Sequence, residues 1–528
     1  MNLDLLLKNS RVLDGNGNPW YKADVGIKGG KIKLIDRMPG DNRGAEKTID
    51  LEGKTLAPGF IDIHTHSDCN FLADSQAASK LRQGVTTELA GNCGVSAVPF
   101  SKEMGFSERI YEAIGEIDWK NFSEFFSRHE ENGLPINLAS LVGHGSLRAE
   151  VMGFEDREPS SKELDQMKDL LAQYMEEGVF GMSTGLYYAP GSYAKTEEVI
   201  ELAKIVSEHG GIYASHIRNE GDRLLESVKE AIKIGEEADL PVEISHHKAV
   251  GKENWGKVKE SLKIIREARK RGVEVTCDQY PYNASSTSLS SLLPRWALQG
   301  GREEWLKKLQ DPDEREKIKK ELGSTNEEKI DWSTVVIVDF LEGKGEELLG
   351  KSIQEIAEER NTEVLQTTID LLIESEGQAS QIHFGIAKED IKTVMAEPFV
   401  MIGSDGSSLK TEGPLGQGKP HPRNYGTFPR VLRKYVREEN TLSLEDAIRK
   451  MTSFPAQKMG LKNKGQIKEG MDADLVAFSP EEITDVATFE EPHQYSEGIY
   501  HVIVNGKLAI ENKESKEYGA GKVLKFRG

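Results

Sequence analysis

The 528-residue sequence predicts an α/β protein whose centre is a (β/α)8 TIM-like barrel. Eight short runs rich in β-branched residues follow one another from residue 57, and amphipathic helical stretches separate most of them. Segments in which apolar and polar residues alternate stand before and after this series. We therefore expect a barrel with a small β-sandwich domain formed from both chain ends and an insertion after the seventh barrel strand.

The two chain ends carry the pattern of short strands and turns. In residues 1–56, where we expect small antiparallel strands, the predicted strands are Asp4–Leu7, Asp24–Ile27, Lys31–Ile35 and Thr48–Leu51. The same pattern returns after about residue 465, with predicted strands at Ala473–Phe478, Gly498–Val504 and Val523–Phe526. A single β-sandwich domain made of residues 1–56 and 465–528 accounts for both ends in the simplest way.

The barrel is predicted to occupy residues 57–464. Its eight expected strands are Gly59–His66, Gly84–Leu89, Ile136–Val142, Gly178–Ser183, Gly211–His216, Pro241–His246, Gly272–Asp278 and Phe399–Ser404. Short apolar runs separated by helical stretches are the pattern of βα units in a parallel sheet. In a barrel of this kind the catalytic groups sit at the C-terminal ends of the strands.

The spacing of the predicted strands is regular except between the seventh and the eighth. The 120 residues from 279 to 398 separate these two, which is too long for a single crossover. Charged helical stretches at Arg302–Leu322 and Val364–Glu376 and an apolar run at Val335–Phe340 fill much of this segment. We predict an inserted subdomain at about 287–398 that is placed to cover the barrel mouth.

Composition and charge exclude several classes of function. The 68 Lys and Arg against 88 Asp and Glu give a formal net charge of −20, which disfavours binding to nucleic acid or to an anionic membrane. No window approaches the ~18 consecutive apolar residues of a membrane span, and the first residues carry no cationic leader. We expect a cytoplasmic protein, and the sequence assigns no oligomeric state. The 3 cysteines are too few for a disulfide framework, so each is a buried thiol or a ligand.

The strongest chemical signal is the end of the first predicted strand, His64-Thr65-His66. Residues i and i+2 of a strand point to the same side, so both imidazoles can reach one metal ion at the barrel mouth. Further candidate ligands follow other strands at the same level. They are Cys93 after the second, His216 at the end of the fifth, His246 at the end of the sixth and Asp405 at the end of the eighth. Thiolate and neutral imidazole are ligands that a borderline-soft ion such as Zn²⁺ prefers.

Each of these residue types also has an ordinary structural interpretation. A lone cysteine is more often a small buried hydrophobe, which is how we interpret Cys69 and Cys277. A lone histidine is more often a hydrogen-bonded structural residue. This applies to His129, His209, His383, His493 and His501, while His144 stays undecided. Chance does not readily explain six suitable groups at five strand ends of one predicted barrel, so we predict a metal site.

A second group of residues has the chemistry of an anion-binding site. Its members are Lys248, two residues after His246, Tyr280 and Ser286 after the seventh strand, and Arg423 after the eighth. Cationic side chains together with hydroxyl donors are what a substrate carboxylate needs. Taken singly, each is more readily interpreted as a surface or packing residue.

The motifs in this order resemble the D-aminoacylases, or N-acyl-D-amino-acid deacylases, of the metal-dependent amidohydrolase superfamily. The resemblance covers nearly the whole chain, including the flanking β segments. It rests on the segments Pro58–His66, Gly91–Gly94, Ser215–Arg218, Ser245–Lys248, Gly403–Gly406 and His421–Arg430. It implies a small-molecule substrate, an N-acyl-D-amino acid, whose amide bond is hydrolysed with zinc to give a D-amino acid and a carboxylic acid.

The resemblance also implies roles for the candidate residues. Cys93, His216 and His246 hold a tightly bound zinc ion, while His64, His66 and Asp405 surround a second, weaker metal position. The substrate carboxylate is bound by Lys248, Tyr280, Ser286 and Arg423. Residues 179–188 contain no lysine, which agrees with a cysteine-ligated site and argues against the carboxylated lysine that bridges two metals in many amidohydrolases.

For the reaction we expect Asp405 to accept the proton of the attacking water and to deliver it to the departing amine, because C–N cleavage needs a protonated leaving group.

Two alternative functions stay open. One is a related amidohydrolase that acts on D-dipeptides or other carboxylated amides, and the other is a noncatalytic scaffold of the same fold. The sequence does not select the amino-acid side chain or the acyl group.

Overall fold

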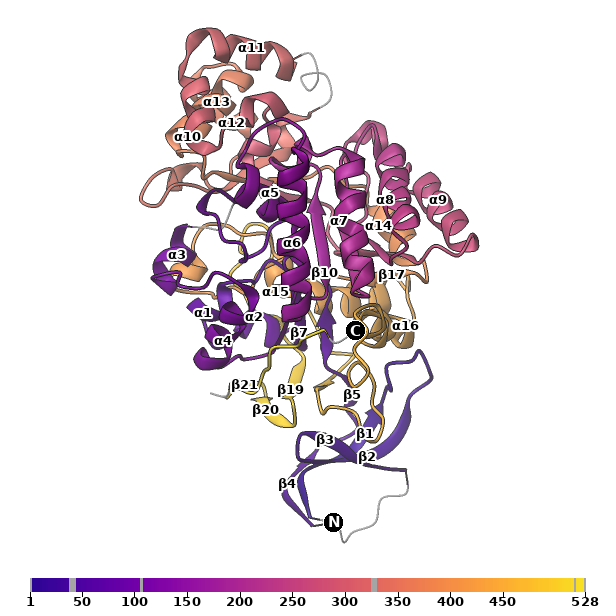
Figure 1. Ribbon diagram of the computed structural model, residues 1–528. Coiled ribbons are helices and arrows are strands. Elements are labelled where there is room, and N and C mark those ends of the chain that lie inside the picture. Colours follow the sequence, from indigo (N-terminus) through magenta and orange to yellow (C-terminus); the bar gives the residue numbers. More distant parts are fainter. Residues whose placement is uncertain (1, 38–43, 105–107, 324–329, 517–518, 527–528) are drawn as a thin grey trace.

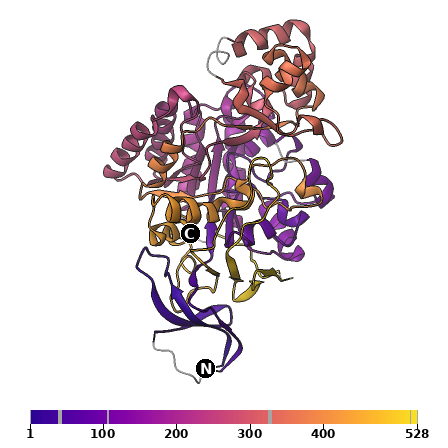
Figure 2. The same ribbon diagram turned by 180° about the vertical axis from the view of Figure 1, so that it is seen from behind.

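The computed structural model describes residues 2–37, 44–104, 108–323, 330–516 and 519–526, and it is an α/β structure (Figure 1). Helices surround a central set of parallel strands. The strands β1 (Leu3–Val12) to β4 (Ala45–Asp50) lie at one end of the molecule, and the helices α10 (Arg302–Gln310) to α13 (Val364–Glu374) lie at the other. The view from behind shows the same arrangement, so the central strands separate these two additions (Figure 2).

Each of the eight predicted barrel strands has a strand at its position. They are β6 (Phe60–Asp62), β7 (Val85–Ala90), β8 (Asn137–Ser140) with β9 (Val142–Gly143), β10 (Gly181–Gly185), β11 (Ile212–His216), β12 (Val242–Ile244), β13 (Val275–Gln279) and β17 (Val400–Ile402). The first is shorter than predicted, because it ends at Asp62 and leaves His64 and His66 in the segment that follows. The residues of these strands are buried, as expected for parallel strands with both faces covered.

The parallel strands form two sheets whose ends meet. One sheet has the order β6-β7-β8 and the other β17-β13-β12-β11-β10-β9, with parallel pairing throughout. Only Leu141 separates β8 from β9, and its N–H donates to the carbonyl of Ala90 at 2.9 Å. Beyond β17 and β6, the N–H of Asp405 donates to the carbonyl of His64 at 2.8 Å. This bond brings the ends of the first and last parallel strands together.

The helices of the parallel part follow the strands. They are α1 (Asn70–Ala73), α2 (Ala78–Leu81), α3 (Glu108–Ile114), α4 (Phe122–Asn132), α5 (His144–Met152), α6 (Ser161–Glu177), α7 (Thr196–Glu208), α8 (Leu224–Ala238), α9 (Val258–Lys270), α14 (Lys388–Met395), α15 (Arg423–Arg430), α16 (Leu444–Met451) and α17 (Ser453–Lys458). The side chains that begin α4, α6 and α16 cap the first turn of the helix. In α6, for example, Ser160 and Glu163 form a capping box and Gly178 ends the helix with φ 108°. Among the described residues, every helix is too short or too polar to cross a membrane.

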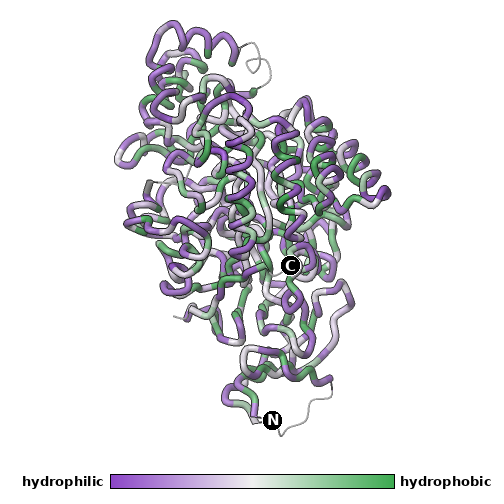
Figure 3. Tube along the Cα trace, in the orientation of Figure 1, coloured by the Kyte–Doolittle hydropathy of each residue, from purple (hydrophilic) through white to green (hydrophobic). Residues whose placement is uncertain are grey.

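The segment after β13 builds a separate structure with its own apolar core. An antiparallel sheet of β14 (Ser285–Ser288), β16 (Ser380–His383) and β15 (Val335–Asp339) carries the helices α10, α11 (Pro312–Leu322), α12 (Ile353–Arg360) and α13. Trp305, Ile318 and Ile369 belong to its own hydrophobic cluster. The outer helix α11 is mostly hydrophilic (Figure 3). Helix α14 packs against α9 and β17 instead, so the inserted part ends before it and not at the predicted residue 398.

Strands from both chain ends form one continuous sheet. Its order is β21 (Glu514–Ser515), β20 (Lys507–Glu511), β19 (Ile499–Val504), β18 (Leu475–Phe478), β5 (Thr55–Pro58), β1, β2 (Tyr21–Lys28) and β3 (Lys31–Asp36), with β4 also on β1. The expectation of small antiparallel strands at the start of the chain is confirmed for β1 with β2 and for β2 with β3. It is wrong for β1 with β4 and with β5, which pair in parallel. These two strands share one edge of the long β1, β4 on its first half and β5 on its last residues.

The last predicted strand, Val523–Phe526, does not join this sheet. The N–H of Leu524 donates to the carbonyl of Leu138 at 2.7 Å, and the N–H of Phe526 donates to the carbonyl of Gly178 at 2.8 Å. The segment therefore lies against β8 and the start of the β10 region. Its apolar residues pack on the parallel sheet, which explains why the segment has the composition of a strand.

Candidate metal centre

The six predicted ligands all lie at or just beyond the C-terminal ends of the parallel strands. His64 and His66 follow β6, Cys93 follows β7, His216 ends β11, His246 follows β12 and Asp405 follows β17. In parallel strands these ends lie on one side of the sheet, so residues far apart in the sequence meet there. All of them except the partly exposed His66 are buried.

Four of the six form a close group. One ligand atom from each of His64, Cys93, His246 and Asp405 lies within 4.8 Å of the others. The Sγ of Cys93 is 3.3 Å from Nε2 of His64 and 3.4 Å from Nε2 of His246. The Oδ1 of Asp405 is 3.4 Å from Nε2 of His64. Sulfur, nitrogen and oxygen donors that converge in a buried place are the arrangement that a transition-metal ion requires.

The remaining two predicted ligands flank this group. Nε2 of His66 lies 3.0 Å from Oδ1 of Asp405, so His66 and His64 approach the same carboxylate oxygen. The ring of His216 lies 4.4 Å from that of His246, measured between centroids. Nδ1 of His216 is buried and has no hydrogen-bond partner among the described residues. The structure thus brings all six predicted ligands to one place.

Three residues of the close group have a backbone conformation that is rare outside glycine. The φ angles are 53° at Cys93, 36° at His246 and 51° at Asp405. Such left-handed conformations cost free energy and persist where the surroundings enforce them, often at functional sites. Their occurrence at three converging strand ends indicates that the fold turns these side chains toward one position.

Glu220 is a member of the site that sequence reasoning missed. Its carboxylate forms a second group of potential ligands with His216 and His246, again within 4.8 Å of one another. Oε1 of Glu220 is 3.0 Å from Nδ1 of His246 and 2.6 Å from Nζ of Lys248. The one feature of the sequence that could have pointed to Glu220 is its place four residues after the predicted ligand His216. The segment around Glu220 has no pattern of a helix or a strand, so this feature is weak. Its contacts with residues 26 and 28 positions away appear only in the folded chain.

The three cysteines have different electrostatic environments. Burial alone raises the pKa of a thiol, and the pKa values of Cys69 and Cys277 lie well above the usual value for this reason. At Cys93 burial has the same effect, but the neighbouring imidazoles of His64 and His246 outweigh it and hold the thiol pKa well below its usual value. Cys93 is therefore the cysteine that is available as a thiolate ligand.

Asp405 is held in its ionised form by its neighbours. Burial raises the pKa of this carboxyl, but Arg423 and the nearby imidazoles outweigh burial and hold the pKa well below its usual range. The Nη1 of Arg423 donates to Oδ2 of Asp405 at 2.7 Å. Burial also lowers the pKa of His66. The hydrogen bond to Asp405 and the nearby Cys93 outweigh burial and raise the pKa of His66 to about 9.

The predicted anion-binding residues also meet, but both cations are already paired. Lys248 pairs with Glu220, and Arg423 pairs with Asp405. The ring of Tyr280 lies beneath both, 5.5 Å from the ammonium and 5.0 Å from the guanidinium carbon. Its buried hydroxyl has no hydrogen-bond partner among the described residues, so it is available to a ligand or to water.

A cavity of about 200 Å³ opens beside the close group. It is lined by His66, Asp405 and Arg423 from the parallel part and by Ser286, Val338, Asp339 and Ser380 from the inserted part, among others. Ser286 also contacts Arg423 through its backbone carbonyl, which accepts from Nη2 at 3.4 Å. The insertion therefore forms one wall of the cavity at the metal centre.

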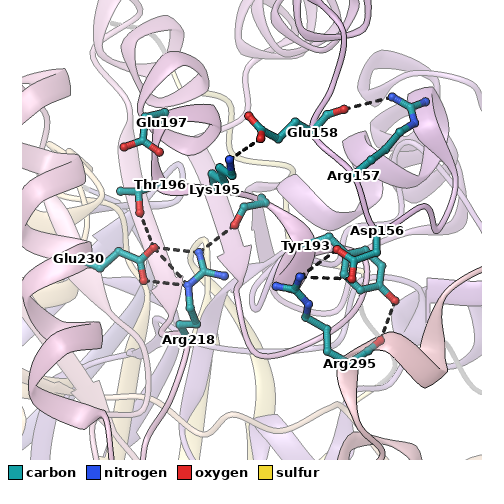
Figure 4. A pocket seen from close by; sticks show the side chains of 11 residues that line it. Asp156, Arg157, Glu158, Tyr193, Lys195, Thr196, Glu197, Arg218, Glu230 and Arg295 are labelled. Carbon is teal, nitrogen blue, oxygen red and sulfur yellow. Dashed lines mark hydrogen bonds and ion pairs between the residues drawn. The ribbon is translucent and has the colours of Figure 1, made fainter.

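A larger cavity, of about 470 Å³, is lined by a different set of residues (Figure 4). Among the described residues that line this larger cavity, none is a predicted metal ligand or a predicted anion-binding residue. Its cations are engaged by acidic neighbours, as in the pairs Arg218 with Glu230, Lys195 with Glu158 and Arg295 with Asp156. The smaller cavity is the one whose lining includes Asp405, a member of the close group, together with His66 and Arg423.

His144, which the sequence left undecided, belongs to a buried polar network. Its Nε2 lies 2.9 Å from Oε1 of Glu198, and Nε of Arg148 lies 3.0 Å from the same oxygen. This network ties α5 to α7 beside the strand ends. His144 is therefore a structural neighbour of the metal centre and not one of its converging donors.

The chain is similar over nearly its whole length to proteins with a named activity. Residues 47–284 and 361–510 match the amidohydrolase family, Amidohydro_3, and the interval between them lies largely in the insertion. The chain is 35% identical over 522 residues to the D-aminoacylase of Alcaligenes xylosoxydans xylosoxydans, covering 99% of this chain and 97% of that protein. It is 34% identical over 524 residues to the N-acyl-D-glutamate deacylase of the same organism, covering 99% and 96%.

A solved structure gives the same relationship. The N-acyl-D-glutamate deacylase of Bordetella bronchiseptica, complexed with zinc and a phosphonate inhibitor that mimics the tetrahedral intermediate of its reaction, matches with a TM-score of 0.84. The two chains are 32% identical, and the match covers 99% of this chain and 100% of that one. The additions at both ends of the parallel sheet are thus included in the similarity.

Proposed function

Because the chain belongs to the D-aminoacylases of the amidohydrolase family, we propose that it hydrolyses the amide bond of N-acyl-D-amino acids in a zinc-dependent reaction. The observation that carries this proposal is the buried group of His64, Cys93, His246 and Asp405 beside the guanidinium of Arg423. It places donors for a metal ion next to a cation for the substrate carboxylate, and Asp405 and Arg423 both line the cavity at this place. The products are a D-amino acid and a carboxylic acid.

The donor chemistry fits zinc. One thiolate, several imidazoles and a carboxylate are ligands that Zn²⁺ accepts, and the low pKa of Cys93 keeps its sulfur ionised. We assign the tightly bound ion to Cys93, His216 and His246, and a second, weaker position to His64, His66 and Asp405. When bound, zinc polarises the scissile carbonyl and lowers the pKa of the attacking water toward neutrality.

Asp405 is the proton carrier in this proposal. Its carboxylate accepts the proton of the attacking water and delivers it to the departing amine. In the structure Arg423 holds the other oxygen of the same carboxylate, which favours the ionised form. When Arg423 turns toward a substrate carboxylate, Asp405 loses this partner and gains proton affinity, which suits a group that must first take up a proton and then donate it.

The stereochemical preference follows from two fixed points. Lys248, Tyr280, Ser286 and Arg423 bind the carboxylate of the substrate, and its amide carbonyl lies beside the residues that would hold the metal ion. With both ends fixed, reversal of the stereocentre directs the amide away from the metal centre. The unpartnered hydroxyl of Tyr280 and the position of Ser286 on the cavity wall support their assignment to this site.

We also infer that the parallel strands close into one eight-stranded barrel. Support comes from the single residue between β8 and β9 and from the pairing of Thr65 with Gly406 beyond β6 and β17. We infer that the sheet built from both chain ends forms the predicted sandwich. Its strand β1 pairs with β4 and β5 on the same edge, and the sheet encloses an apolar cluster of its own. A cytoplasmic location stays a prediction from the sequence.

Amine release from paired N-acetyl-D- and N-acetyl-L-amino acids tests the proposal. The assay uses zinc-loaded protein of known metal content and Met, Leu, Phe, Glu and Asp as side chains. We expect turnover of D substrates only, and the preferred side chain names the specificity. Absence of turnover with zinc bound would overturn the deacylase assignment, and D-dipeptides and other carboxylated amides would be assayed next. A protein that stays zinc-free and inactive after zinc supplementation would instead favour a noncatalytic scaffold.

A further inference from the structure

Asp278 is a fully buried carboxylate that touches two predicted metal ligands from two other strands. It lies on β13 and is 1% exposed. Its Oδ2 is 3.1 Å from Nδ1 of His64, which follows β6. Its Oδ1 accepts a hydrogen bond from the backbone N–H of His246, which follows β12, at 2.9 Å. One side chain thus links the ends of the first, sixth and seventh parallel strands.

The contact with His64 determines which ring nitrogen carries the proton. A carboxylate only accepts hydrogen bonds, so Asp278 requires a proton on Nδ1 of the imidazole. The lone pair of the neutral ring is then on Nε2, the atom that lies 3.3 Å from Sγ of Cys93. A histidine that ligates a metal through one nitrogen commonly donates its other N–H to a carboxylate in this way.

The contact with His246 holds an unfavourable backbone conformation in place. His246 has φ 36°, and its N–H is bound by the side chain of Asp278. The next N–H, that of His247, donates to the backbone carbonyl of Asp278 at 2.8 Å. Two consecutive amides are thus attached to a single residue. This attachment directs the His246 ring toward Cys93, with Nε2 3.4 Å from Sγ.

The packing around Asp278 leaves no room for adjustment. Gly403 stands opposite, and a Cβ at this position would lie 2.8 Å from Cβ of His64 and 3.0 Å from Oδ1 of Asp278. Only glycine therefore permits β17 to approach these two side chains. The sequence gives no sign of this arrangement, because its partners come from three strands.

We propose that Asp278 is a positioning residue of the metal centre: it fixes the Nδ1–H tautomer of His64 and the backbone of His246, so that both Nε2 atoms face the Sγ of Cys93 and each is directed to its own proposed metal position. The inference rests on the proposed metal-dependent function of the site. It assigns Asp278 no contact with the metal ion or the substrate. Its expected effect is on how tightly and in which geometry the metal is held.

Asp278→Asn is the variant of choice because it preserves size and removes one acceptor. If the amide oxygen keeps the bond to the His246 N–H, the amide NH2 faces His64 and favours a proton on Nε2, which blocks metal ligation there. Glu243→Gln is the matched control. It makes the same carboxylate-to-amide change on the neighbouring strand β12, where the carboxylate accepts a hydrogen bond from Thr276.

The experiment follows metal release to a chromophoric chelator from the zinc-loaded full-length chain. We expect zinc release from Asp278→Asn to be at least about tenfold faster than from wild type, and that from Glu243→Gln to stay within about twofold. The cobalt-substituted protein provides a second readout, since a changed ligand geometry shifts the visible absorption bands of Asp278→Asn only. Unchanged zinc release and an unchanged cobalt spectrum in Asp278→Asn would overturn the proposal.

A spectroscopic measurement on the wild type keeps the proposal falsifiable if the variant does not fold. In ¹⁵N-histidine spectra of the zinc-loaded protein, with His64 assigned by comparison with His64→Gln, we expect the proton of His64 on Nδ1. A proton on Nε2 would contradict the role of Asp278. Failure of the proposed function has a different signature, because it would appear as a wild type that binds no zinc or hydrolyses no N-acyl-D-amino acid.

Discussion

Arg423 and Asp405 form a buried ion pair, with Nη1 of the guanidinium 2.7 Å from Oδ2 of the carboxylate. The two residues have different proposed tasks, since Arg423 binds the substrate carboxylate and Asp405 carries the proton. Their pairing means that the substrate carboxylate competes with Asp405 for the same guanidinium. If both residues have their proposed tasks, substrate binding and activation of the proton carrier are coupled through this ion pair.

Replacement of this arginine tests the coupling. Arg423→Lys turns a planar fork into a point charge, which cannot bind Asp405 and a carboxylate with the same geometry. We expect KM for the D substrate to rise by roughly tenfold or more, since the loss of one good charged hydrogen bond costs about 1.5 kcal/mol or more. Steady-state kinetics check this, with Arg433→Lys as the control because Arg433 pairs with Asp485 and Glu438 instead. An unchanged KM would count against the carboxylate-binding role.

Removal of the proton carrier should separate metal binding from catalysis. Asp405→Asn keeps the size of the side chain but cannot accept a proton at neutral pH. We expect zinc at the Cys93 position to be nearly retained and kcat to fall by roughly 10²–10⁴, the usual contribution of general acid–base catalysis. Metal analysis and kcat are measured on the same preparation. A variant with nearly the wild-type rate would exclude Asp405 from this role.

The cysteines offer a test of the metal site with an internal control. Cys93→Ser replaces a thiolate with a hydroxyl that stays protonated, so we expect most of the tightly bound zinc to be lost. Cys69→Ser should retain zinc, because burial raises the pKa of that thiol and the residue lies apart from the converging donors. Equal zinc content in the two variants would show that Cys93 is not a ligand.

The stability of the fold should depend on pH through His129. Burial lowers the pKa of His129 to about 4, although its Nε2 lies 3.0 Å from the carbonyl of Asp68. The unfolded chain, with a pKa near 6.5, binds the proton more readily. The stability that neutral His129 provides is therefore complete above about pH 6.5 and is lost as the pH falls to about 4, on the order of 3 kcal/mol in total.

His129→Gln isolates this contribution. Burial raises the pKa of the neighbouring Asp68 to about 6, so protonation of Asp68 acts in the opposite direction and the wild-type curve alone mixes the two. Urea unfolding between pH 7 and pH 4 should show a smaller loss of stability in the variant than in the wild type. Parallel curves for the two proteins would contradict the assignment.

The sequence was sufficient for the parts of the molecule that depend on local pattern. Apolar runs between helical stretches located the parallel strands, and His64, His66, Cys93, His216, His246 and Asp405 could be chosen because they end or follow such runs. Parallel strands bring their C-terminal ends to one side, so convergence followed from strand order without knowledge of side-chain positions.

The predictions that were wrong and the residues that were missed depend on contacts between segments that are distant in the sequence. The parallel pairing of β1 with β4 and β5 is a choice of strand orientation, which the alternation of apolar and polar residues does not specify. Glu220 acts through His246 and Lys248, and nothing in its local sequence marks it. Asp278 ends the seventh predicted strand, but its contacts with His64 and His246 appear only in the folded chain. Residues 523–526 have a strand-like composition because they lie along β8 of the parallel sheet, where Val523 pairs with Leu138, and composition alone does not tell which sheet such a segment joins.

The most direct test of the proposed function is the initial rate of amine release from N-acetyl-D-methionine and its L enantiomer, measured on metal-stripped protein before and after addition of zinc. We expect no turnover of either compound without metal and hydrolysis of the D enantiomer alone once zinc is bound. Hydrolysis of both enantiomers, or undiminished turnover in the stripped protein, would contradict the claim that the metal centre and the carboxylate-binding residues act together.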